Sequence, residues 1–108
     1  MIDEITPSDL DAWRRDATPA APYVLDVREP WEHDKARIDG STLIPMREIP
    51  ARVAELPDDR DIVVLCHHGA RSLQVAAWLA RNGLRRVHNL AGGIDAWSRT
   101  VDPAIPRY

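Results

Sequence analysis

The chain has 108 residues, 44% of them hydrophobic and 29% charged, which is the composition of one globular domain and excludes a long disordered or low-complexity chain. Its formal net charge of −3 argues against a general nucleic-acid binder or a protein held on a membrane surface by charge. We therefore expect a single domain over residues 1–108, with no nucleic-acid and no membrane partner.

The first half of the chain alternates helical and strand-like segments. A helix is expected to begin after Thr6, a good N-cap, because Pro7 suits the first helical position and the acid Asp9 suits the positive helix end. Short apolar runs then predict strands, and stretches that mix charge with Pro or Gly predict short helices or loops. The expected order is a helix to about residue 15, a break at 17–22, a strand at 23–27, a short helix or structured loop at 29–41, a strand at 42–45 and a helix at 46–56.

The second half contains the most apolar segment. After a turn at 57–60, residues 61–66 form a nearly continuous apolar run that predicts a strand buried on both faces. The helix that follows should end at Gly83, since glycine favours the C′ position. The remaining elements are then a strand at 84–90, a helix or turn from 91–97 and an irregular tail at 101–108, which holds two prolines.

Strands that alternate with helices predict an α/β fold with a parallel sheet covered on both faces. In such sheets ligands bind outside the carboxyl ends of the strands. This rule places Asp26 and Arg28, Arg47, and the single cysteine, Cys66, on the same edge of the sheet.

Cys66 lies where the buried strand meets the next helix. Backbone N–H groups of such a loop point inward and the helix end adds partial positive charge, so the thiolate is favoured and can act as a nucleophile. Gly69 lets the loop turn tightly where N–H groups must approach an anion. A cation at a helix start is mildly unfavourable, so Arg71 is expected either to meet an anionic substrate or to pair with a carboxylate such as Asp26.

Less specific interpretations apply to the same residues. Cys66 would be a buried core thiol if it stood alone, but cysteine, glycine and arginine at positions 1, 4 and 6 of one loop favour catalysis. His67 and His68 either tune the thiolate or contribute mainly their backbone amides, which we favour. Adjacent residues rarely converge on one ion, so we expect no metal site. Asp26 is expected to pair with Arg71 or with Arg28, and internal pairing is the favoured use of Arg28.

A lone cysteine cannot form an intrachain disulfide, which favours a reducing compartment. The first residues lack an apolar signal segment, and the run Ile62–Cys66 is too short to cross a bilayer. We expect a cytoplasmic protein.

Three blocks of the sequence resemble the rhodanese-like sulfurtransferases: YVLDVREPWE at 23–32, CHHGARS at 66–72 and NLAGGIDAW at 89–97. Residues 36–41 depart from the family's Gly-His-Ile-Pro-Gly-Ala segment. The resemblance implies a three-layer fold with a central parallel sheet of about five strands. It also implies that Cys66 is catalytic, that Asp26 and Arg28 support the site, and that a substrate-binding loop is formed by His67, His68, Gly69, Ala70, Arg71 and Ser72.

The resemblance further implies a covalent mechanism. Thiolate Cys66 would take the outer sulfur of a small anionic donor such as thiosulfate, and a thiol, a protein thiol or cyanide would remove it from the resulting persulfide. No metal or organic cofactor is implied. The backbone amides of residues 67–71 would hold the persulfide anion, Arg71 would attract the donor, and Ser72 would support the helix start.

Two alternatives remain open. The first is a sulfur-carrier or regulatory module that acts with a protein partner instead of thiosulfate. Related phosphatases and arsenate reductases of this fold use a Cys-x5-Arg loop, but here only four residues separate Cys66 from Arg71. The smaller loop suits a single sulfur atom better than a tetrahedral phosphate.

Overall fold

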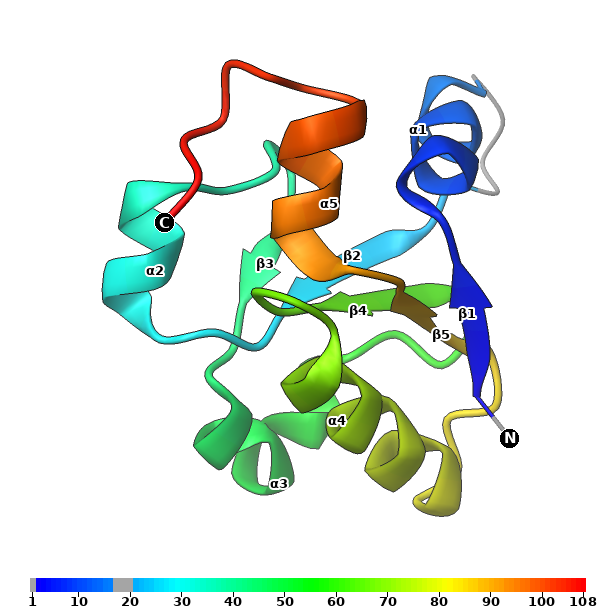
Figure 1. The fold of residues 1–108 in the computed structure, drawn as a ribbon. Coiled ribbons are helices and arrows are strands. Elements are labelled where there is room, and N and C mark those ends of the chain that lie inside the picture. Colours follow the sequence, from blue (N-terminus) through cyan, green and yellow to red (C-terminus); the bar gives the residue numbers. More distant parts are fainter. Residues whose placement is uncertain (1, 17–20) are drawn as a thin grey trace.

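The computed structural model describes residues 2–16 and 21–108, so the predicted break at 17–22 lies mostly outside the described residues. A five-stranded parallel sheet, in the order β1-β5-β4-β2-β3, forms the centre of the molecule (Figure 1). The expected α/β fold is confirmed. The strands are β1 Asp3–Ile5, β2 Tyr23–Asp26, β3 Thr42–Leu43, β4 Ile62–Leu65 and β5 Val87–Leu90.

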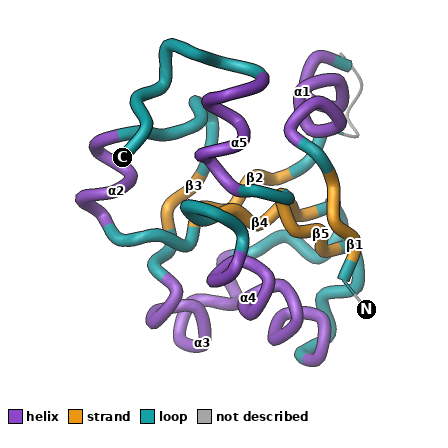
Figure 2. Tube along the Cα trace, in the orientation of Figure 1, coloured by secondary structure: helices purple, strands orange, loops and turns teal. Residues whose placement is uncertain are grey.

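Helices cover both faces of the sheet (Figures 1 and 2). On one face lie α3 (Ile49–Arg52) and α4 (Ala70–Arg81), and on the other lie α1 (Pro7–Arg15), α2 (Pro30–Lys35) and α5 (Gly93–Thr100). Strand β4 is buried on both sides, because Ile62 and Val64 pack into the α3–α4 core while Val63 and Leu65 pack into the α1–α5 core. This alternation follows from the two-residue period of a strand.

Local signals in the sequence set the helix ends. Thr6 and Asp9 form a reciprocal capping box at the start of α1, as the N-cap signal predicts. Gly83 has φ +99°, and the N–H of Leu84 donates to the carbonyl of Leu79 at 3.0 Å, which is the Schellman closure of α4. The irregular tail at 101–108 is also confirmed.

One strand lies where none was predicted, and one predicted helix needs correction. Residues 3–5 form a strand, β1, which pairs with β5 although two of its three residues are exposed acids. The helix predicted over residues 46–56 is broken into a 3₁₀ turn, η1 (Met46–Glu48), the four-residue α3 and a second 3₁₀ turn, η2 (Val53–Glu55). Pro50 sits in the first turn of α3, where a missing N–H is tolerated, so the chain restarts its helix there.

The described part of the chain contains no helix long and apolar enough to span a membrane.

Candidate active site

Cys66 directly follows the carboxyl end of β4 and is 1% exposed. Three donors face its sulfur. The N–H of Gly69 lies 3.1 Å from Sγ, the N–H of Ser72 lies 3.4 Å away, and the hydroxyl oxygen of Ser72 lies 3.3 Å away. Donors that converge on one sulfur stabilise negative charge there, which is what a nucleophilic thiolate needs. Ser72 therefore faces the sulfur directly, in addition to lying in the first turns of α4.

Gly69 has φ +108° and directly precedes α4, which begins at Ala70. This left-handed conformation is accessible to glycine at little cost and brings the Gly69 N–H back toward Cys66. The sequence-based expectation for Gly69 is confirmed in its geometry.

The first residues of α5 form hydrogen bonds to the backbone of the loop. The N–H groups of Ile94 and Asp95 donate to the carbonyls of Cys66 and His67, at 2.9 and 3.1 Å. At Gly93, with φ +62°, an added Cβ would lie 2.5 Å from both carbonyl oxygens. Close backbone approach thus explains the second glycine of the Gly-Gly pair, whereas a Cβ at the first, Gly92, would lie 2.6 Å from Cβ of Ala96.

Arg71 pairs with Glu32 of α2. Its two terminal nitrogens each donate to one carboxylate oxygen at 2.8 Å. This bond is the main reason why the pKa of Glu32 falls to about 2, and it raises the pKa of Arg71. Of the two arginines left open as partners of Asp26, Arg28 is the one observed, and the carboxylate that pairs with Arg71 is Glu32.

Asp26 and Arg28 form a buried ion pair, with Nη2 of Arg28 2.7 Å from Oδ2 of Asp26 and both side chains at most 1% exposed. Arg28 also donates to the carbonyls of Glu32, inside α2, and of Ala36, the residue that caps the end of α2. His33, for which the sequence offers no partner, places Nδ1 2.9 Å from the same Oδ2. The pair holds α2 against the sheet, and α2 presents Glu32 to Arg71.

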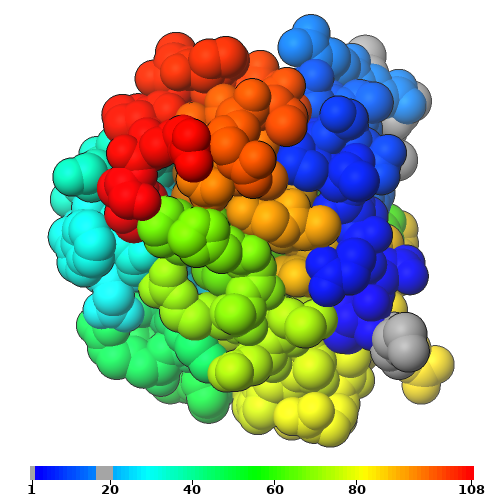
Figure 3. Space-filling model, viewed as in Figure 1, coloured from blue at the N-terminus to red at the C-terminus, as the bar shows by residue number. Residues whose placement is uncertain are grey.

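Aromatic rings cover the loop. The His67 ring stacks between those of His68 and Tyr108, at centroid distances of 3.9 Å on each side. The Tyr108 hydroxyl donates to Glu32 and accepts from Arg28, both at 2.8 Å, and burial is the main cause that raises the pKa of Tyr108 to about 12. Figure 3 shows the C-terminal tail against the active-site loop and α2. Tyr108 was not expected at the site from sequence.

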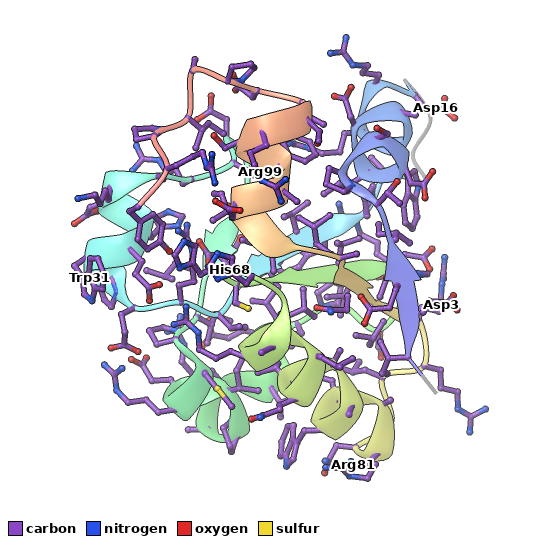
Figure 4. The ribbon with its side chains drawn as sticks, in the orientation of Figure 1. Asp3, Asp16, Trp31, His68, Arg81 and Arg99 are labelled. Atoms are coloured by element: carbon purple, nitrogen blue, oxygen red, sulfur yellow. The ribbon has the colours of Figure 1, made fainter. Side chains whose placement is uncertain are left out.

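The rings of His67 and His68 make stacking contacts, and the expected contribution of their backbone amides stays a prediction. Burial, followed by the electrostatic effect of His68, lowers the pKa of His67. His68 is more exposed and lies over the loop in the middle of Figure 4, whereas Arg81 lies at the far end of α4. Arg81 is therefore remote from the chemistry, as its position ten residues after Arg71 predicts.

Nitrogen and oxygen atoms of His67, His68 and Asp95 lie within 4.8 Å of one another. The two imidazole planes are within 20° of parallel, so their lone pairs do not converge. Both carboxylate oxygens of Asp95 also accept from arginines, Arg99 at 3.1 Å and Arg107 at 3.0 Å. These contacts do not favour a cation.

Asn89, near the end of β5, is a buried member of the site that sequence reasoning did not single out. Its Oδ1 lies 2.5 Å from the Ser72 hydroxyl oxygen, and its Nδ2 donates to the carbonyl of Gly69 at 3.2 Å. Asn89 is the first residue of the NLAGGIDAW block, and that position in the sequence is the signal that could have identified it.

The chain is similar to known proteins over nearly its full length. A rhodanese-like domain model matches residues 6–100. A sulfurtransferase of Allochromatium vinosum is 41% identical over 105 residues, which cover 97% of this chain and 96% of that protein. The thiosulfate sulfurtransferase GlpE of Stutzerimonas stutzeri is 31% identical over 81 residues, covering 75% of this chain and 74% of that one.

The solved structures agree in fold. A rhodanese-related protein from Thermoplasma volcanium superposes with a TM-score of 0.84 at 31% identity, covering 98% of this chain and 99% of that one. Other relatives are longer: the chain spans 30% of the length of a rhodanese-like/PpiC domain-containing chloroplast protein of Arabidopsis thaliana, to which it is 43% identical. On the family match and the shared fold, this chain belongs to the rhodanese-like domain family.

Proposed function

We propose that this protein is a sulfurtransferase that carries sulfane sulfur on Cys66, from thiosulfate or a persulfide donor to a thiophilic acceptor. The observation that carries the proposal is the convergence of three donors, from Gly69 and Ser72, on one buried sulfur. The family supports sulfur chemistry, and two relatives bear the names sulfurtransferase and thiosulfate sulfurtransferase.

The proposed reaction has two half-reactions. The Cys66 thiolate attacks the outer sulfur of the donor, a new S–S bond forms, and the donor's S–S bond breaks with its electron pair leaving on sulfite or on a thiolate. An acceptor nucleophile then attacks the outer sulfur of the persulfide, and Cys66 leaves as the thiolate. Such a double displacement gives ping-pong kinetics. The two displacements require neither a metal nor an organic cofactor.

Arg71 supplies positive charge at the end of the loop, but Glu32 already accepts hydrogen bonds from both of its terminal nitrogens. Charge attraction to a dianion such as thiosulfate is therefore weaker than a free arginine would give. This observation favours a second candidate: a sulfur carrier or regulatory module whose donor is a persulfide delivered by a protein partner. The phosphatase alternative has less support, since the loop has four residues between Cys66 and Arg71 and its donors converge on Sγ itself.

Thiocyanate formation from cyanide distinguishes these candidates. We expect steady-state turnover with thiosulfate, with parallel lines in double-reciprocal plots, and no turnover by Cys66→Ser. Efficient loading only from cysteine persulfide or a protein persulfide would favour the carrier function. Hydrolysis of an aryl phosphate by wild type that disappears in Cys66→Ser would instead support a phosphatase.

A further inference from the structure

The Ser72 hydroxyl lies between two acceptors. Its Oγ is 2.5 Å from Oδ1 of Asn89 and 3.3 Å from Sγ of Cys66. A serine hydroxyl has one hydrogen to donate, so it serves either the amide oxygen or the sulfur at any moment. Which of them receives it depends on the relative strength of the two acceptors.

The amide of Asn89 is held in one orientation. Its Nδ2 donates to the carbonyl of Gly69 at 3.2 Å and to Oε1 of Glu4 at 3.0 Å. Both of those oxygens are acceptors, so a reversed amide would place its oxygen against two other oxygens. Oδ1 of Asn89 therefore faces Ser72. Asn89 is 2% exposed and Ser72 is fully buried, so a partner that either residue loses is not replaced freely by water.

We propose that Asn89 is a positioning residue that competes with Cys66 for the hydroxyl hydrogen of Ser72. When Cys66 is a thiol, its S–H can donate to Oγ of Ser72, whose own hydrogen points to Asn89. When the thiol has lost its proton to solvent, the negative sulfur is the stronger acceptor. The hydroxyl then rotates to the sulfur, its O–H bond stays intact, and Oδ1 of Asn89 loses the hydrogen bond that it accepted from Ser72.

This competition has a consequence that rests on the proposed function. As the Cys66 thiolate forms its bond to the donor's outer sulfur, negative charge leaves Sγ and the hydroxyl returns to Asn89. In the second half-reaction Cys66 becomes the leaving group, and the hydroxyl turns back to the sulfur as charge develops there. The Ser72 hydroxyl thus supports both half-reactions, because Oδ1 of Asn89 offers the hydroxyl hydrogen a second acceptor.

The test is the pH dependence of Cys66 alkylation by iodoacetamide, with each rate expressed relative to the same variant's high-pH plateau. The rate follows the thiolate fraction and needs no sulfur donor. Asn89→Leu removes the competing acceptor, so the profile should move to lower pH, and alkylation below the wild-type midpoint should rise about fivefold, the effect of roughly one hydrogen bond. If the leucine variant does not fold, Asn89→Val removes the same acceptor with a residue that favours strands.

A double-mutant cycle separates positioning from general support of the loop. In a Ser72→Ala background, Asn89→Leu should cause no further shift, because the hydroxyl through which Asn89 acts is gone. Glu4→Gln changes a residue that accepts from Nδ2 of Asn89 and does not touch the Ser72 hydroxyl, so it should leave the pH profile of alkylation unchanged. A shift of equal size in the Ser72→Ala background would overturn the proposal, as would an unshifted profile in a folded Asn89→Leu or Asn89→Val variant.

The outcome does not depend on turnover. If the alkylation profiles behave as expected but Cys66 takes no sulfur from any donor, the proposed function fails and the role of Asn89 stands. If sulfur transfer proceeds and the profiles do not move, the role of Asn89 fails alone.

Discussion

Glu32 and Arg71 meet through two parallel hydrogen bonds of 2.8 Å, one to each carboxylate oxygen. The pair joins α2 to the first turn of α4, and the Glu32 side chain is only 5% exposed, whereas that of Arg71 is 36% exposed. A carboxylate buried to this degree depends on its partner for solvation. The same contact therefore contributes to stability and limits the positive charge that Arg71 can offer to a donor.

The first prediction concerns acid stability. The pKa of Glu32 in the folded protein is about 2, below its ordinary value of 4.5, so the ionised side chain stabilises the fold above about pH 4.5 and this contribution is lost as pH falls toward 2. Between pH 5 and pH 2.5 the wild type should lose about 2 kcal/mol more free energy of unfolding than Glu32→Gln, as measured by urea denaturation. Equal losses in the two proteins would show that the pair does not set the titration of Glu32.

The second prediction separates anion binding from folding at Arg71. Arg71→Ala should raise the KM for thiosulfate about tenfold, since it removes positive charge at the end of the loop. It should also cost about 2 kcal/mol, because Glu32 loses its partner. The double variant Arg71→Ala with Glu32→Gln should regain most of that stability, whereas its KM for thiosulfate should stay raised. An unchanged KM with a large fall in Tm would show that the arginine is structural.

The third prediction compares two glycines that both have positive φ. At Gly93 a new Cβ would lie 2.5 Å from the carbonyl oxygens of Cys66 and His67, whereas at Gly83 nothing lies within 4 Å. Gly93→Ala should lose about 3 kcal/mol or more and most of the activity. Gly83→Ala should lose about 1 kcal/mol and keep the activity. Similar effects of the two changes on stability and turnover would contradict the close packing of α5 against the loop.

These glycines illustrate what the sequence can predict. The C′ position of Gly83, the tight turn at Gly69 and the capping box at Thr6 follow from residues close together in the chain, so local patterns suffice. The buried strand and the position of Cys66 at its carboxyl end were predicted for the same reason. The segment at 36–41, which departs from the family pattern, still buries Ala36 and Ile38.

The errors concern contacts between distant segments. Glu32 is 39 residues from Arg71, and Tyr108 is 76 residues from Glu32. No spacing rule connects them, because their meeting depends on how α2, α4 and the tail pack. Strand β1 was missed for a similar reason, since its exposed acids carry no apolar pattern and it exists through pairing with β5. Asp26 was placed on the edge of the sheet correctly, but its partner could not be chosen between two arginines.

The fourth prediction concerns that buried pair of Asp26 and Arg28. Arg28→Met should cost about 3–4 kcal/mol of unfolding free energy, because it leaves a carboxylate buried without its partner. Adding Asp26→Asn should restore a large part of the loss. Chemical denaturation of the three proteins measures both effects. A single variant that loses less than about 1 kcal/mol would show that Asp26 finds adequate solvation from His33 and the backbone alone.

Intact mass spectrometry shows whether Cys66 itself carries sulfur. The protein is treated with thiosulfate and desalted, and its mass is measured. It is then treated with cyanide, and its mass is measured again. Wild type should gain the mass of one sulfur atom and lose it to cyanide as thiocyanate, while Cys66→Ser should keep its mass throughout. A wild-type protein that gains no sulfur from thiosulfate or from any persulfide donor, or a Cys66→Ser variant that gains as much as wild type, would contradict the account.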